Sequence, residues 1–266
     1  MTSHWSPPAQ QRRILLFGPP EVDALPATAE VLSVSSYCCS PPRTLWLARV
    51  ACRSEMSQET ANPLFARFFH RFCGRDRGTG EQELRRELLA GARGRVIEVG
   101  AGNGINFEHY PPSVSEVVAI EPEPYLRAQA EKAAQRAPVP TRVTKGTAAA
   151  LELETGSADV LVVSGVLCSV SDQAAALAEF RRVLRPGGEL RFYEHVRSRR
   201  SGFARWQRLV DGLWSRMMGG CHTDRDTLAA ITDAGFSIER CRGFGFPPHA
   251  ICYPVAPRIL GVARAD

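Results

Sequence analysis

A glycine-rich turn between apolar segments restricts the fold of this chain more than any other feature. The turn runs from Glu98 to Gly104 with the sequence EVGAGNG, and it follows the apolar pair Val96-Ile97. Glycine adopts positive φ and lets the backbone approach a ligand closely. A helix that begins after Gly104 would also direct free N–H groups at a polar or anionic group. The segment therefore predicts a strand, a turn and a helix that together bind a nucleotide-like cofactor.

The spacing of the glycines argues against two common nucleotide sites. A dinucleotide-binding turn has the pattern G-x-G-x-x-G, but counting from Gly100 puts Ile105 in place of its third glycine. A phosphate-binding P-loop needs Gly-Lys-Ser/Thr, and this turn contains no lysine. The pattern E-x-G-x-G-x-G resembles instead the first motif of class I S-adenosylmethionine-dependent methyltransferases.

An acidic residue stands where the next parallel strand would end. Glu121 follows the apolar run from Val117 to Ile120. A carboxylate at this place can accept hydrogen bonds from both ribose hydroxyls of an adenosyl group. We therefore expect Glu121 to bind the sugar of the cofactor.

Composition indicates one globular catalytic domain and no nucleic-acid partner. The 266 residues are 44% apolar and carry a formal net charge of +5. The charge comes almost wholly from arginine, because Lys132 and Lys145 are the only lysines. No basic stripe interleaved with aromatic residues occurs, so we do not infer binding to nucleic acid. The sequence does not decide the oligomeric state.

The cysteines and the apolar runs favour a cytoplasmic protein. The 8 cysteines are irregularly spaced, without a C-x-x-C pair or a Cys/His zinc pattern, and so predict reduced thiols and no metal site. No apolar run approaches the ~20 residues that span a bilayer. The run from Arg12 to Phe17 is too short for a signal-peptide core. We predict no integral membrane segment.

The N-terminal segment, residues 1–55, differs in composition from the rest of the chain. Proline pairs at 7–8, 19–20 and 41–42 interrupt short apolar stretches that have no sustained period. Such a composition buries too little apolar surface to offset the entropy of ordering, so we predict a disordered extension. Met56 resembles a natural start, and N-terminal sequencing of the native protein would test whether translation begins there.

The body, residues 56–266, is predicted to be the catalytic domain and begins with helical patterns. Asn62 is the expected N-cap and Pro63 the first helical residue, followed by a phenylalanine stripe at 65, 68, 69 and 72. This stripe is expected to pack in the core and to serve as a lid over the cofactor. A second helix is expected at 81–89.

Strands and helices then alternate along the chain. We expect strands at 95–99, 116–120, 141–145, 158–163 and 188–194, with helices at 104–109, 123–136 and 172–184. This alternation predicts right-handed βαβ units in a parallel sheet with helices on both faces. Helices at 203–217 and 224–234 and a last strand pair, 237–244 and 258–264, would complete a seven-stranded, mostly parallel, Rossmann-like α/β fold.

Several further motifs carry a closer resemblance. Over residues 92–264 the chain is similar to the methyltransferase-like thiol S-methyltransferases of animals and their bacterial relatives. The glycine turn and Leu184-Arg185-Pro186-Gly187-Gly188 are shared by many class I enzymes, whereas Leu167-Cys168-Ser169-Val170, Glu194-His195-Val196 and Gly220-Cys221-x-Thr223 point to this subgroup. The animal enzymes have an apolar N-terminal anchor without a counterpart in residues 1–55, so the resemblance does not imply membrane attachment.

The resemblance implies a class I methyltransferase fold with S-adenosylmethionine as cofactor, bound in a core of about residues 92–196. Ligands of open parallel sheets lie beyond the carboxyl ends of the strands. Glu98 is expected to orient the ammonium group of the cofactor, directly or through water. The other residues expected at the cofactor besides Glu121 are Gly100, Ala101, Gly102, Gly104, Thr147, Ala148, Gly165 and Val166.

The acceptor is expected to be a small molecule, with a thiol favoured by the resemblance. A thiol with a pKa of about 8.5 attacks as its thiolate and needs little help from a base. His195 is the expected proton acceptor, because it follows the fifth strand at the active-site edge. Cys168, Glu194 and Cys221 are expected around the substrate. A metal site of His195, Cys221 and His222 is not predicted, since their spacing matches no standard zinc pattern.

Three alternatives share part of this pattern. A methyltransferase acting on an oxygen, nitrogen or carbon acceptor, such as a quinone, lipid or other small metabolite, would have the same cofactor motifs. A nicotinamide-dependent dehydrogenase of the short-chain type would need Tyr-x-x-x-Lys, and no tyrosine here has a lysine four positions later. A non-catalytic regulatory protein would bind the cofactor without turnover on any acceptor.

Overall fold

A computed structural model describes residues 62–73, 79–247 and 253–265. Residues 1–55, with the predicted disordered extension, and the possible start at Met56 lie outside the described residues. The strands are β1 (Gly94–Val99), β2 (Val114–Ile120), β3 (Thr141–Thr144), β4 (Ala158–Ser164), β5 (Leu184–His195), β6 (Phe236–Gly245) and β7 (Pro257–Ala265).

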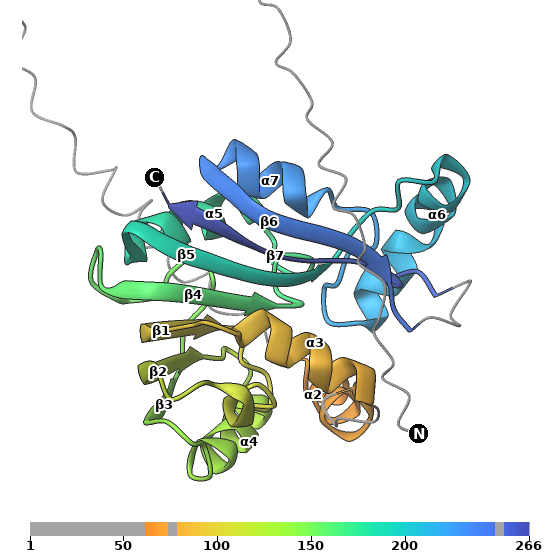
Figure 1. Cartoon of the computed structure of the whole chain (residues 1–266). Coiled ribbons are helices and arrows are strands. Elements are labelled where there is room, and N and C mark those ends of the chain that lie inside the picture. The colour runs from red at the N-terminus through yellow and green to blue at the C-terminus, as the bar shows by residue number, and fades with distance from the viewer. Residues whose placement is uncertain (1–61, 74–78, 248–252, 266) are drawn as a thin grey trace, which may run out of the picture. The chain divides into compact units, whose positions relative to one another are not determined.

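These strands form one sheet of seven in the order β3-β2-β1-β4-β5-β7-β6 (Figure 1). Strands β1 to β5 pair in parallel, whereas β7 runs antiparallel to both β5 and β6. The predicted seven-stranded, mostly parallel sheet with an antiparallel final pair is therefore confirmed. A sheet of this kind gathers the carboxyl ends of its parallel strands at one edge.

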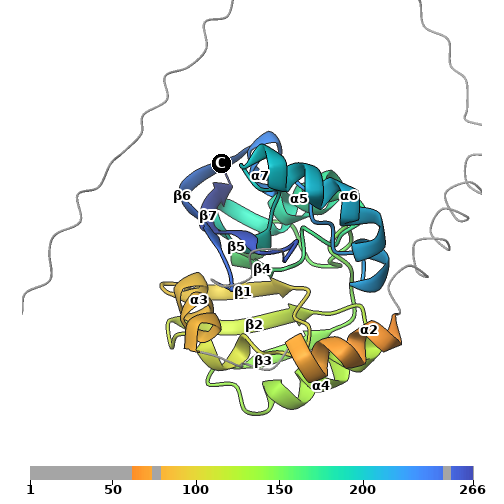
Figure 2. The same ribbon diagram turned by 90° about the vertical axis from the view of Figure 1, so that its right-hand side faces the viewer.

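Helices cover both faces of the sheet, as predicted. The α-helices are α2 (Pro63–Phe68), α3 (Thr79–Leu89), α4 (Pro124–Ala134), α5 (Gln173–Val183), α6 (Ser201–Met217) and α7 (Thr227–Asp233), of which α3, α4, α5 and α7 contribute to the cores on the two faces. Since successive strand residues point to opposite faces, Ile97 packs in one core with α5 and α7, and Val96 in another with α3 and α4. Figure 2 shows where these helices lie around the sheet. In the part of the chain that the structure describes, no helix is long and apolar enough to span a membrane.

The start of α2 follows from its first two residues. The Asn62 side chain accepts a hydrogen bond from the Phe65 N–H at 3.0 Å, which satisfies one of the free donors at the helix start. Pro63 occupies the first turn, where no N–H is needed. The predicted N-cap is confirmed. The helix continues as a π-helical turn, Phe69–Cys73.

The prediction of a helix at 104–109 was wrong. Only a short 3₁₀ turn forms, Phe107–His109, with i to i+3 bonds from the Phe107 N–H to Gly104 O at 3.1 Å and from the His109 N–H to Asn106 O at 3.0 Å. The prolines at 111–112 cannot donate and disfavour helix in the residue before them. Loop backbone and side chains, rather than the N-terminus of a helix, therefore follow the glycine turn.

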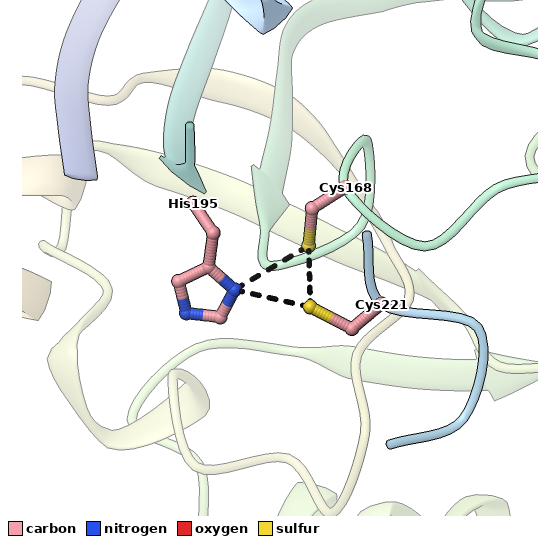
Figure 3. Close-up of side chains that lie close together, drawn as sticks. All are labelled: Cys168, His195 and Cys221. Carbon is pink, nitrogen blue, oxygen red and sulfur yellow. Dashed lines mark hydrogen bonds between the residues drawn. The ribbon is translucent and has the colours of Figure 1, made fainter. Parts of the chain in front are cut away.

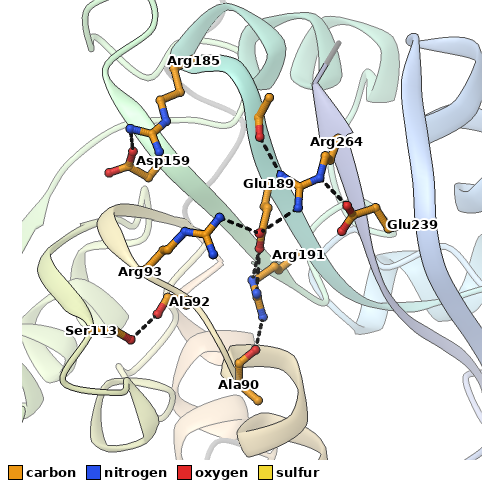
Figure 4. A network of polar contacts seen from close by, with 11 residues as sticks. Ala90, Ala92, Arg93, Ser113, Asp159, Arg185, Glu189, Arg191, Glu239 and Arg264 are labelled. Carbon is orange, nitrogen blue, oxygen red and sulfur yellow. Dashed lines mark hydrogen bonds and ion pairs between the residues drawn. The ribbon is translucent and has the colours of Figure 1, made fainter.

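A buried arginine attaches the end of α3 to strand β5 (Figure 4). Arg191 on β5 is 3% exposed and donates to Glu189 at 2.7 Å and to the carbonyl oxygens of Leu88 and Ala90 at 3.0 and 2.6 Å. A buried guanidinium is stable only when its donors are satisfied in this way. Because α3 also contributes to the cavity described next, this contact helps to position the site.

Candidate active site

A cavity of about 1450 Å³ opens at the carboxyl ends of the parallel strands. Its wall contains residues from the segments that follow β1, β2, β3 and β4 and from the end of β5, as expected for ligand sites in open parallel sheets. The predicted cofactor residues that line it are Glu98, Gly100, Ala101, Gly102, Glu121, Thr147, Ala148, Gly165 and Val166. Of the residues predicted near the acceptor, His195, Glu194 and Cys221 line the same cavity.

The glycine turn brings backbone to the cavity wall. Gly100 has φ +67°, and a Cβ at this residue would lie 2.5 Å from Cγ2 of Val166, so the loops after β1 and β4 meet here without room for a side chain. Gly104 has a different role, because it does not line the cavity. A Cβ there would meet Phe107 at 2.7 Å and Ala133 of α4 at 2.8 Å, so Gly104 allows close packing.

Glu121 connects the end of β2 to the glycine turn. Its carboxylate is 5% exposed and accepts the Gly102 N–H at 2.7 Å and the Glu123 N–H at 3.0 Å. Burial raises the pKa of Glu121 to about 7, although the two backbone donors oppose this shift. A carboxylate offers about four acceptor positions. Glu121 can therefore hold the loop and still accept bonds from hydroxyl groups in the cavity.

Glu98 is held by side chains that the sequence analysis did not assign to the site. Its two oxygens accept from Asn106 Nδ2 at 2.8 Å and from the Tyr110 hydroxyl at 2.7 Å, and Arg85 donates to Asn106 Oδ1 at 2.7 Å. Burial raises the pKa of Glu98 to about 7, against the effect of the Tyr110 and Asn106 hydrogen bonds. Asn106 and Tyr110 lie close to the glycine turn in sequence. No local pattern marks Arg85, because it reaches the site from α3.

Glu194 at the end of β5 organises the loop after β4. It is 1% exposed, and its two oxygens accept the N–H groups of Val166 at 2.9 Å and of Cys168 at 3.1 Å. Burial raises the pKa of Glu194. This carboxylate thus positions both a predicted cofactor residue and the neighbouring cysteine.

Cys168, His195 and Cys221 lie together, although they come from three separate segments (Figure 3). His195 Nδ1 lies 3.5 Å from the sulfur of Cys168 and 3.4 Å from that of Cys221, and the two sulfurs are 3.7 Å apart. The hydrogen bond between the two thiols lowers the pKa of Cys221 and raises the pKa of Cys168. Burial raises the pKa of Cys168 further. Cys168 does not line the cavity but lies behind the other two.

His222 is not part of this cluster. Its Nδ1 contacts Asp211 Oδ2 at 2.7 Å, and the other Asp211 oxygen accepts the Thr223 N–H at 2.6 Å. Asp211 is on α6, so these contacts attach the segment that carries Cys221 to that helix.

Aromatic side chains from distant segments complete the wall near the cluster. Trp214 and Tyr253 line the cavity with their ring centroids 5.5 Å apart and pack against the cysteines together with Val255. The sequence analysis missed Tyr253 and Val255, for which no motif gives a signal. This part of the cavity is apolar and suits an acceptor of low polarity.

The phenylalanine stripe is divided between the cavity and the surface. Phe65 and Phe69 line the cavity, whereas Phe68 is 45% exposed and the side chain of Phe72 lies outside the described residues. A Cβ on Gly219 would lie 2.5 Å from the Phe65 ring, so α2 touches the turn after α6. The position of α2 is therefore compatible with the predicted lid.

Comparisons with known proteins identify relatives of this chain. Residues 97–192 match a family described as a methyltransferase domain. The human thiol S-methyltransferase TMT1B is 37% identical over 186 residues, which cover 66% of this chain and 73% of that protein. Human thiol S-methyltransferase TMT1A is 36% identical over 182 residues, covering 63% and 73%. Geranyl diphosphate methyltransferase, solved in complex with S-adenosylmethionine, has the same fold, with a TM-score of 0.54, 13% identity and coverage of 70% and 85%.

Proposed function

We propose a thiol as the methyl acceptor of this enzyme, because the chain belongs to the class I S-adenosylmethionine-dependent methyltransferase family that includes the thiol S-methyltransferases. Methyl transfer with S-adenosylmethionine as cofactor follows from membership of this family. The identity of the atom that accepts the methyl group goes beyond family membership, and the residues that line the cavity support sulfur as this atom.

The cavity suits an adenosyl cofactor on one side. Gly100 lets the backbone after β1 lie directly against Val166 at the wall, and the buried Glu121 carboxylate can accept ribose hydroxyls beside it. Thr147 and Ala148 would border the adenine, Gly165 and Val166 the sulfonium, and Glu98 the ammonium group. When bound, S-adenosylmethionine supplies an electrophilic methyl carbon attached to positively charged sulfur.

The single observation that carries the thiol proposal is that His195 and Cys221 line the same cavity as this cofactor wall. They are accompanied by the aromatic wall of Trp214 and Tyr253. Apolar walls exclude water and align a soft, weakly hydrated nucleophile with the methyl carbon, which is most of what such a displacement requires. His195 uses Nδ1 toward the two sulfurs, so the proposed acceptance of a thiol proton would fall to Nε2.

The test is incubation of the full chain with methyl-labelled cofactor and acceptors of matched shape that differ in one atom, namely thiophenol, phenol and aniline, together with a quinol. Mass spectrometry should detect the labelled thioether as the main product. A Gly100→Val variant is the control, because its side chain would overlap Val166 and block the cofactor wall. Labelled ether or amine as the main product would contradict the proposal.

Two further assignments remain proposals. Residues 56–266 would form the catalytic domain, which is supported by the domain match at 97–192. A cytoplasmic location is supported by Cys168, Cys221 and Cys241, which are free thiols. A disulfide that involves any of these three in the native protein would count against that location.

A further inference from the structure

We propose that Cys168, His195 and Cys221 bind a zinc ion whose open coordination position holds the acceptor thiol as a thiolate. The three side chains are the one His/Cys/Asp/Glu group with metal-ligand spacing among the described residues. The second half of the proposal, binding of the acceptor, rests on the proposed thiol methyltransferase function. The spacing of these residues in the sequence predicted no metal, so the inference depends on their arrangement in space.

The distances within the cluster match the edges of a zinc tetrahedron. Zinc lies about 2.3 Å from cysteine sulfur and about 2.0–2.1 Å from histidine nitrogen. Tetrahedral angles then separate two sulfurs by about 3.8 Å and a sulfur from a nitrogen by about 3.5–3.6 Å. The corresponding distances here are 3.7 Å between the sulfurs and 3.5 and 3.4 Å from Nδ1 to each sulfur. The three donor atoms are therefore spaced as three corners of a zinc tetrahedron.

The backbone around the cluster holds the ligands at this spacing. The N–H of His222, next to Cys221, donates to the Cys168 carbonyl oxygen at 2.8 Å, which joins the two cysteine segments directly. The Glu194 carboxylate accepts the Cys168 N–H, and Asp211 accepts the Thr223 N–H. Contacts of this kind orient metal ligands and raise affinity.

The fourth coordination position would face the cavity. Cys168 is 1% exposed and lies behind, whereas Cys221 and His195 line the cavity. Glu194 directly precedes His195, but both oxygens of its carboxylate already accept backbone N–H groups, so Glu194 is not expected to be the fourth ligand. A site with three protein ligands and one open position is typical of catalytic zinc, whereas structural zinc has four protein ligands.

The three ligands come from the three segments that most closely resemble the thiol S-methyltransferase subgroup, rather than class I methyltransferases in general. Cys168 lies in Leu167–Val170, His195 in Glu194–Val196 and Cys221 in Gly220–Thr223, the segments through which the sequence resembles the thiol S-methyltransferase subgroup. The glycine turn, which many class I methyltransferases share, contributes no ligand. The cluster is therefore associated with the acceptor side of the site.

An ion at this position would activate the acceptor. A thiol that binds zinc loses its proton, here to solvent, and remains on the ion as a thiolate at neutral pH. The acceptor sulfur then forms a bond to the methyl carbon, the bond from that carbon to the sulfonium breaks, and its electron pair stays on the departing sulfur. The neutral thioether binds zinc weakly and leaves. His195, with Nδ1 bound to the ion, would then serve as a ligand and not as the proton acceptor.

The experiment measures zinc in the full chain, purified with reductant and dialysed against a weak chelator. Inductively coupled plasma mass spectrometry should find about one zinc per chain in the wild type and in Cys241→Ser, a control cysteine on β6. Cys221→Ser and His195→Gln should bind zinc at least about tenfold more weakly. Circular dichroism checks that the variants are folded.

A second measurement needs no variant. Cobalt added to the zinc-free wild type should give the absorption bands of tetrahedral cobalt–thiolate coordination, and thiophenol should change these bands while phenol should not. Absence of zinc and of cobalt–thiolate bands in the folded wild type, or equal zinc in all variants, would overturn the metal site. Thioether formation by zinc-free protein at the rate of the loaded protein would overturn activation of the acceptor by the ion and leave the proposed function intact. Methylation of phenol alone by the loaded protein would refute the proposed function and acceptor binding but not the ion.

Discussion

Cofactor affinity is expected to rise with pH through neutrality because of Glu121. Burial raises the pKa of this group to about 7 in the free protein, with a smaller contribution of the same sign from Glu123 and an opposing one from Arg127. Below that pH most molecules carry a protonated carboxyl group, which accepts hydroxyl donors poorly. Cofactor binding at low pH must therefore release a proton, and affinity falls as pH falls.

The size of the effect follows from the pKa. If the carboxylate stays ionised in the complex, the dissociation constant is multiplied by about eleven at about pH 6 and by about 1.1 at about pH 8. The Glu121 contribution to affinity should therefore increase about tenfold over this range, equivalent to about 1.4 kcal/mol. Titration calorimetry in buffers with different ionisation enthalpies would give both the affinity and the number of protons released.

Glu121→Gln is the reference variant, since it cannot titrate at this position. Its own pH profile accounts for ionisation of the cofactor's amino group and of Glu98, whose pKa is also raised to about 7. Both Glu121 oxygens accept a backbone N–H, so an amide places its NH₂ against one of these donors. We expect binding at about pH 8 to weaken by about 1.5–3 kcal/mol. Equal pH slopes in the wild type and the variant would refute the reasoning, as would wild-type affinity that falls with rising pH.

Three other predictions concern stability. Gly104→Ala should lower the free energy of unfolding, measured in urea, by about 3 kcal/mol, because Gly104 has positive φ and a Cβ there would overlap Phe107. Gly156 also has positive φ but open space beside it, so Gly156→Ala should lower the free energy of unfolding by only about 1 kcal/mol. Equal losses would contradict the packing argument. The pKa of Glu98 is raised to about 7 in the folded protein, so its contribution to stability is present below the unfolded pKa of 4.5 and is lost as pH rises through about 7. Glu98→Gln should therefore reduce the fall in stability between acidic and alkaline pH by up to about 3 kcal/mol. An unchanged dependence of the melting temperature on pH would count against this. Arg191→Leu should destabilise by about 3 kcal/mol, and Arg264→Leu, on the surface, should destabilise by much less. Similar urea midpoints for the two variants would contradict the argument from burial.

The sheet could be predicted because its signals are local. Each of the strands β1, β2 and β4 has a short apolar run, and β2 and β4 are each followed by a helix with a recognisable start. The helix expected at 104–109 failed for a local reason too. The prolines at 111–112 and the positive φ of Gly104 limit the segment to a single turn.

That most of the residues predicted at the cofactor would lie together was predictable, because parallel strands bring residues that follow them to one edge. Gly100, Glu121 and Gly165 therefore line one cavity although they lie far apart in the chain. Gly104 was an exception, since only the tertiary structure shows that Phe107 and α4 occupy the space beside it.

The amino-acid sequence alone determined the fold class and the kind of cofactor, because periodic apolar runs and the glycine turn act over a few residues. The cluster of Cys168, His195 and Cys221 was decided only by the tertiary structure. Its members are separated by 27 and 26 residues and come from a loop, a strand end and a turn after a helix. No spacing rule relates such segments, because the distances between their side chains depend on how the whole sheet and its helices pack.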